Sequence, residues 1–174
     1  MRGSALAGGF WHRLDQTARN LLPFGSIVMA MLLAMVPLPL PGYSVVTPPL
    51  VLICLFYWVI HRPDLLRPLV VFALGVLHDL ISGSPLGVTS LYLILTYWLL
   101  ITQRRFFLGR SFGMLWLGFA LVAFGASVVQ WLVFALMSAH LLDARPVLVH
   151  AALGVALFPL PTYLLQRLHR AYLS

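Results

Sequence analysis

The sequence predicts an all-helical membrane protein, a bundle of about six transmembrane helices with both termini in the cytoplasm. Of its 174 residues, 61% are apolar and only 9% are charged, and the mean hydropathy is +0.98. Soluble domains carry about 25% charged residues. Lys and Glu are absent, so the 11 arginines and four aspartates cannot coat a soluble surface. At about 20 residues per span, the chain has room for six or seven helices and for little else.

Residues 1–20 differ from the rest because arginines and other polar residues alternate there with aromatic and aliphatic ones. This mixture predicts a cytoplasmic interfacial segment. A cleaved signal peptide is disfavoured, since the apolar run that follows is too long and lacks a clean small-residue cleavage site. We therefore expect a six-helix membrane domain over residues 21–168 and a short cytoplasmic tail over residues 169–174.

Six apolar segments divide the membrane domain, at residues 22–40, 50–60, 69–81, 88–102, 112–139 and 147–166. The first ends in a proline-rich stretch that a helix interior does not tolerate. The second, third and fourth reach only about 18 to 23 Å against a hydrocarbon core of about 30 Å, so they must borrow flanking residues. The fifth is long enough to cross with a tilt. The sixth carries Pro159 and Pro161 near its end.

The arginines orient these segments. Ten of the 11 fall in the N-terminal segment, in the links after the second and fourth segments, or in the tail, and only Arg145 falls on the other side. Cytoplasmic loops retain positive charge, so this bias requires an even number of spans with both termini inside. The net charge of +7 then lines one membrane face, which indicates contact with lipid headgroups rather than with nucleic acid.

Asp79 is the only acidic residue expected at membrane depth, where a charged aspartate costs about 2.5 to 3.5 kcal/mol. Gly75, Asp79 and Gly83 recur every four residues, so they share one helix face on which a neighbouring helix can pack closely. Two structural roles are open for Asp79. It is either protonated and hydrogen-bonded, or it accepts bonds from the free N–H groups where the fourth helix begins near Gly87. Partner binding or an ion path is the functional alternative.

Other polar residues do not combine into a catalytic or metal site. His78 and Asp79 are adjacent, but neighbouring helical side chains point about 100° apart and further ligands are missing. Cys54 has no partner for a disulfide. We expect no enzymatic activity, no metal and no cofactor. Gln130 indicates a hydrogen bond between helices, either within the chain or to a partner.

A pair of alanines in the first apolar segment, Ala30 and Ala34, is spaced so that both lie on one face of a helix. Small residues at this spacing let another helix approach closely. The pair therefore predicts a docking face for a partner helix.

An ordered set of short motifs resembles the MreD family of rod shape-determining proteins over roughly residues 21–168. The motifs are Tyr57-Trp58, Arg62-Pro63, Gly75-x-x-x-Asp79-Leu80-x-x-Gly83-x-Pro85-Leu86-Gly87 and Phe158-Pro159-Leu160. The third is the specific one. The resemblance assigns helix packing or partner binding to its glycines, to Asp79, and to Pro85 and Leu86.

What the resemblance implies is a non-enzymatic scaffold of the bacterial cell-elongation machinery. Such a scaffold would sit in the inner membrane and serve rod shape and lateral peptidoglycan synthesis. It would bind MreC and link it to MreB and to the membrane peptidoglycan synthase. The family is also similar in helical architecture to the substrate-binding components of energy-coupling-factor transporters, whose first helix carries an alanine-spaced docking face like Ala30 and Ala34.

That second similarity supplies the competing class, a membrane subunit that binds a vitamin or another small molecule. Such a subunit needs an outer cavity with convergent polar groups. The segments expected outside offer few of them: Tyr43, Ser44, Thr47, Ser82, Ser84, His140 and Asp143. A third class, an ion channel, needs several ionisable groups within the membrane, and only Asp79 is expected there.

The arginine asymmetry makes a direct topological prediction. Alkaline phosphatase fused after Gly42 should be active and phosphatase fused after Arg105 inactive, because the first position is expected outside and the second inside. A cytoplasmic fluorescent protein should give the opposite pattern. Phosphatase activity after Arg105, or fluorescence after Gly42, would overturn the proposed orientation.

Overall fold

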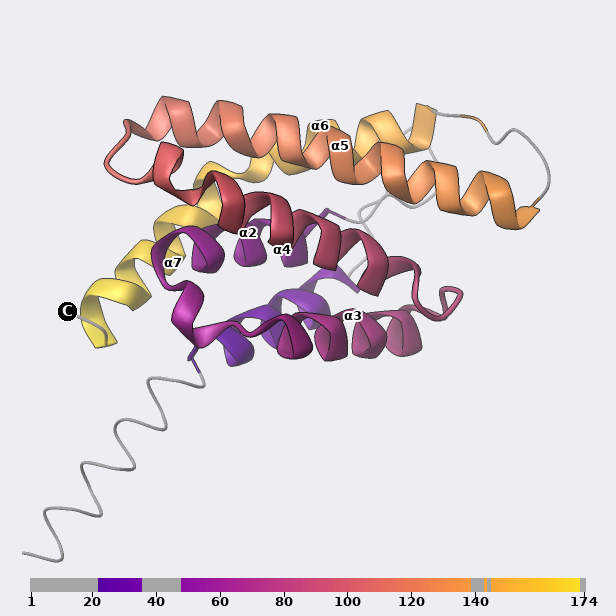
Figure 1. The fold of residues 1–174 in the computed structure, drawn as a ribbon, viewed down its shortest axis with the longest axis horizontal. Coiled ribbons are helices and arrows are strands. Elements are labelled where there is room, and N and C mark those ends of the chain that lie inside the picture. Colours follow the sequence, from indigo (N-terminus) through magenta and orange to yellow (C-terminus); the bar gives the residue numbers. More distant parts are fainter. Residues whose placement is uncertain (1–21, 36–47, 139–142, 144, 173–174) are drawn as a thin grey trace, which may run out of the picture.

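The computed structural model describes residues 22–35, 48–138, 143 and 145–172, and these form helices and connecting turns without any strand (Figure 1). The helices are Leu22–Ala34, α2 (Leu50–His61), α3 (Pro68–Ser82), α4 (Val88–Phe107), α5 (Phe112–Ser138), α6 (Arg145–Leu157) and α7 (Pro159–Tyr172). A short 3-10 turn, η1 (Pro63–Leu65), joins α2 to α3. The expected interfacial segment 1–20 and the proline-rich end of the first segment lie outside the described residues.

Helix α2 is the centre of the bundle. Every residue from Val51 to Ile60 is buried, so this helix is covered on all sides. Helices α4, α7 and α5 pack against it. The helix Leu22–Ala34 is tied to it by the indole Nε1 of Trp58, which donates to the hydroxyl of Ser26 at 2.7 Å. A helix that is apolar all round is typical of a protein core or of a membrane span, and here neighbouring helices provide the apolar surroundings.

Four phenylalanines join the central helix to its neighbours. The ring of Phe56 on α2 meets Phe107, Phe119 and Phe158 edge-on, at centroid distances of 5.9, 5.4 and 5.7 Å. Phe119 and Phe158 stack at 4.5 Å. Edge-to-face contacts of this kind add to the gain from burial. They fix α4, α5 and the α6–α7 junction on α2.

The last apolar segment, expected as one helix, is two. Helices α6 and α7 are bent by 46° at Phe158, and α7 continues to Tyr172. The break follows from Pro159, which takes the first position of α7 and has no N–H to continue the ladder of α6. The hydroxyl of Thr162 donates to the Phe158 carbonyl at 2.6 Å.

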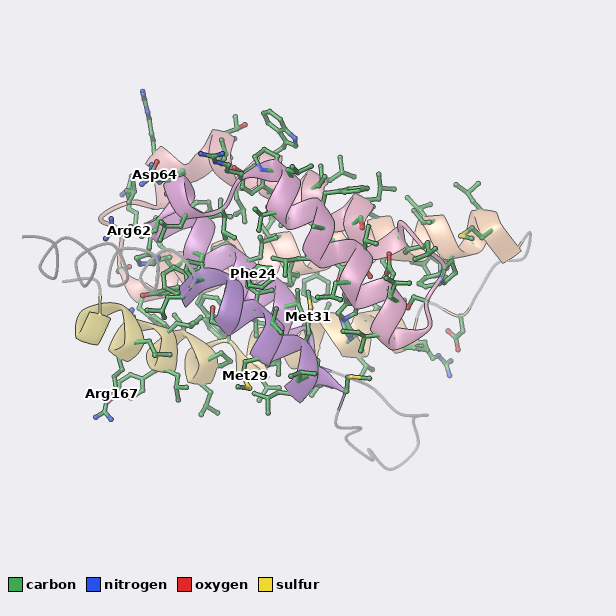
Figure 2. The ribbon with its side chains drawn as sticks, turned by 90° about the horizontal axis from the view of Figure 1, so that it is seen from below. Phe24, Met29, Met31, Arg62, Asp64 and Arg167 are labelled. Atoms are coloured by element: carbon green, nitrogen blue, oxygen red, sulfur yellow. The ribbon has the colours of Figure 1, made fainter. Side chains whose placement is uncertain are left out.

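The links between helices gather at two opposite ends. The connections after α2 and after α4 and the C-terminal part of α7 lie at one end, whereas the α3–α4 turn and the end of α5 lie at the other (Figure 1). Figure 2 shows Arg62, Asp64 and Arg167 together at the first end. There the guanidinium Nε of Arg104 donates to the Ile60 carbonyl at 2.9 Å. The arginine-bearing links therefore share one end of the bundle.

The outer surface is apolar as well as the core. Leu69 on α3 is 77% exposed, and Leu121 and Leu136 on α5 are 76% and 81% exposed. Among the residues that the structure describes, one helix, α5, is long and apolar enough to cross a membrane by length and composition. The bent pair α6–α7 adds a second crossing if the two helices count as one span. The helix Leu22–Ala34, α2 and α3 are apolar but shorter.

Candidate functional site

Asp79 lies at the end of α3 and its carboxylate is fully buried. One oxygen, Oδ2, accepts from the backbone N–H of Gly87 at 2.8 Å, and the other, Oδ1, accepts from the N–H of Thr89 at 3.2 Å. These donors belong to the first turn of α4, where N–H groups lack partners within the helix and where the helix dipole favours negative charge. This is the geometry of the second structural role, in which Asp79 accepts hydrogen bonds from the start of α4.

Gly75 lies one turn before Asp79 and faces the same neighbour, α4. A Cβ atom at this position would collide with the backbone of Ser90, so only glycine allows the two helices to approach this closely. The hydroxyl of Ser90 donates back to the Phe72 carbonyl at 3.3 Å. Helices α3 and α4 thus form one tightly packed hairpin, whose two arms run side by side in Figure 1.

Gly83 has a different role from the one its spacing predicts. Helix α3 ends at Ser82, and Gly83 adopts the left-handed conformation with φ of 68°. Among the described residues, no atom of another helix lies within 4 Å of the position that its Cβ would take, so it makes no close helix contact there. The backbone N–H groups of Gly83 and Ser84 both bond to the Asp79 carbonyl. Gly83 therefore terminates α3, and the packing face comprises only Gly75 and Asp79.

The tip of the hairpin presents the remaining motif residues. Gly87 also has a positive φ, of 98°, and allows the chain to enter α4. Pro85 is exposed, and Leu86 is 68% exposed. Leu86 is therefore an apolar side chain at the end of the bundle opposite the arginines, without any packing role within the described residues.

The two alanines of the first helix face inward. Ala30 and Ala34 are 5% and 7% exposed, and Ala30 packs in the core beside Met31. Met29 points away from the bundle, whereas Met31 is buried (Figure 2). The small-residue face is thus used within the chain, and the exposed face carries larger side chains such as Met29 and Leu33. Sequence spacing gave the two faces of this helix but not which one is covered.

The other polar candidates do not form a metal site. No three His, Cys, Asp or Glu side chains come together among the residues that the structure describes. His78 lies 3.4 Å from the hydroxyl of Thr89. Gln130, expected to bond a neighbouring helix, makes no hydrogen bond to another described residue and instead lines a cavity. That cavity is a feature that the sequence reasoning missed.

Replacement of Asp79 should destabilise the hairpin in proportion to the acceptors removed. Asp79→Leu leaves the N–H groups of Gly87 and Thr89 unpaired, at about 1 to 3 kcal/mol each. Asp79→Asn keeps one acceptor oxygen, so its stability should lie between that of Asp79→Leu and that of the wild type. Thermal unfolding in mild detergent measures the order, with Asp64→Leu, at an exposed position, as the matched control. Equal midpoints for Asp79→Leu and the control would contradict the capping role.

The two glycines should respond differently to the same residue. Gly83→Asn should be nearly neutral because asparagine tolerates the left-handed conformation. Gly75→Asn should cost at least about 1 to 3 kcal/mol, because its Cβ meets the backbone of Ser90. Unfolding midpoints of the two variants give the comparison. If both lose the same stability, close packing rather than turn geometry also governs position 83.

Comparison with known proteins assigns the chain to a family. The family model for rod shape-determining protein MreD matches residues 16–168. The rod shape-determining protein MreD of Haemophilus influenzae is 31% identical over 107 residues, which cover 62% of this chain and 64% of that relative. The similarity to this relative thus spans slightly less than two thirds of its length. No solved structure matches the chain. Because the family model covers every described helix up to residue 168, the chain belongs to the MreD family of rod shape-determining proteins.

Proposed function

We propose that this protein is a multi-pass scaffold of the bacterial inner membrane, needed for rod shape and lateral peptidoglycan synthesis. The observation that carries the proposal is the family match over residues 16–168, which takes in the whole described bundle up to that residue. The role described for the family is shape determination. The chain performs it by holding other proteins together and not by catalysis.

The membrane placement is supported by the apolar outer faces. Large apolar side chains are exposed on α3, α4, α5 and α7, including Leu69, Leu121 and Leu164. Soluble proteins rarely expose apolar patches of that extent. The short α2 is covered by its neighbours, so it needs no lipid-facing length of its own. We therefore propose six crossings, with α6 and α7 together forming the last.

The orientation is supported by the two ends of the bundle. Links that carry arginines lie at one end and the α3–α4 turn lies at the other (Figure 1). Positive charge marks the cytoplasmic side of a membrane protein. We therefore propose that this end of the bundle and both termini lie in the cytoplasm, where MreB is. The α3–α4 turn, with Leu86 exposed at its tip, then faces the periplasm, the side that MreC occupies. The exposed turn is the contact we propose for MreC. We propose that the peptidoglycan synthase contacts the membrane-facing sides of the bundle.

The cellular test is depletion in a rod-shaped bacterium that carries no second copy. Loss of the chain should round the cells and disperse wall insertion. Affinity purification in mild detergent should recover MreC and the synthase. Cells that stay rod-shaped would contradict the scaffold role, and recovery of an ATPase pair instead would favour a transport subunit.

A pair of substitutions localises the proposed MreC contact. Leu86→Asp places a charge at the exposed tip and should reduce MreC recovery about tenfold, since an apolar contact is lost and a charge is desolvated. Leu108→Asp is the matched control, because Leu108 is 47% exposed in a link at the opposite end. Both should reach the membrane at wild-type abundance. Equal MreC recovery for the two variants would exclude the Leu86 turn as the contact.

A further inference from the structure

A cavity of about 320 Å³ lies beside the α3–α4 hairpin and is open on one side. Four helices each contribute a polar side chain with a ring or an amide: His78 from α3, Tyr92 from α4, Gln130 from α5 and His150 from α6. All four are half-buried. These residues are far apart in sequence, so only the fold brings them to one place.

Two polar side chains elsewhere in the interior hydrogen-bond to the backbone of the chain itself. The hydroxyl of Tyr97 donates to the Leu66 carbonyl at 2.8 Å, and the hydroxyl of Thr162 donates to the Phe158 carbonyl at 2.6 Å. The side chain of Gln130 has no such bond to a described residue, although it lies in the second half of α5, the most apolar long helix of the bundle. An amide in such surroundings needs a partner, because burial without one is unfavourable. A ligand bound in the cavity would supply this hydrogen-bond partner.

A smaller pocket continues the cavity between α2, α5 and α6. It shares Tyr92, Gln130 and His150 with the cavity, and it adds Ser127, whose side chain is 5% exposed. Polar side chains therefore line the inner part of the cavity as well as its opening. Apolar side chains, including those of Met31 and Leu52, complete the lining of the cavity.

The lining sets the chemistry of a ligand. No arginine or aspartate lines the cavity within the described residues, and the nearby Asp79 carboxylate is occupied by the N–H groups of Gly87 and Thr89. A phenol, an amide and an uncharged imidazole can each donate and accept hydrogen bonds. The ligand is therefore uncharged, with donors and acceptors along one edge and an apolar face. Ring compounds such as neutral nucleosides and neutral sugars share this chemistry.

We propose that this cavity binds an uncharged ring compound, held at its edge by Tyr92 and Gln130 and packed on its face against Met31 and Leu52. The volume is near the lower limit of ligand sites, about 300 to 1,000 Å³. This binding is additional to the scaffold role and involves no transport step.

The test uses the purified full chain in mild detergent, with adenosine and N-acetylglucosamine as probes. A ligand that binds only the folded state raises the thermal midpoint as its concentration increases. We expect a saturable rise in the thermal midpoint with one of the two probes at millimolar concentration. The probe that raises the midpoint shows whether the ligand is a nucleoside or a sugar. No rise with either probe overturns the proposal.

Matched variants show whether a bound probe occupies this cavity. Gln130→Leu removes the amide, and Tyr92→Phe removes only a hydroxyl, so that each should weaken binding about tenfold. Gln103→Leu makes the same change as the first at an exposed position of α4 and should bind like the wild type. If Gln130→Leu fails to fold, Tyr92→Phe alone decides. Wild-type affinity in the folded variants would place the ligand elsewhere, and MreC recovery from the same preparations reports on the scaffold role separately.

Discussion

The bond between the Asp79 carboxylate and the first turn of α4 determines how the two arms of the central hairpin meet. Inside an apolar bundle no water is present to satisfy a free N–H group, so a helix that begins there needs an acceptor from another element. Asp79 supplies two acceptors from the last turn of α3. With α4 fixed at this end, its other end reaches the links around α2, where Arg104 and Tyr97 donate to the carbonyls of Ile60 and Leu66. One buried carboxylate thereby sets the position of a helix that contacts α2, α3 and α5.

The same shortage of water explains the position of α2. This helix has only 12 residues, about 18 Å, which is too short to span a hydrocarbon core of about 30 Å, and the surrounding helices cover it on every face. The aromatic contacts of Phe56 join it to α4, to α5 and to the junction of α6 and α7. The bend at Phe158 is part of this arrangement, because it brings a buried ring onto Phe119 while Pro159 starts the next helix.

A bundle built in this way keeps its small residues for itself and presents large ones outward. Gly75 and the two alanines of the first helix face neighbours in the chain. Large apolar side chains such as those of Met29, Leu33 and Leu86 remain exposed. The small residues are therefore used to pack the helices of the chain together, and its outer faces carry the large apolar side chains. The polar cavity departs from this division, because polar side chains from four helices line one space there.

The sequence by itself determined the all-helical fold class, most helix boundaries and the two structural roles open for Asp79. Composition and the length of apolar runs are local properties, and they fix helices such as α3 and α5 to within a few residues. The sequence motifs also pointed to the MreD family, which the family match over residues 16–168 bears out. Periodicity could not show that α3 ends before Gly83, because helix termination depends on the turn geometry that follows. Nor could it show which face of the first helix is covered, or that Tyr92, Gln130 and His150 meet in one cavity. Those features arise from contacts between helices distant in sequence, so only the tertiary structure decided them.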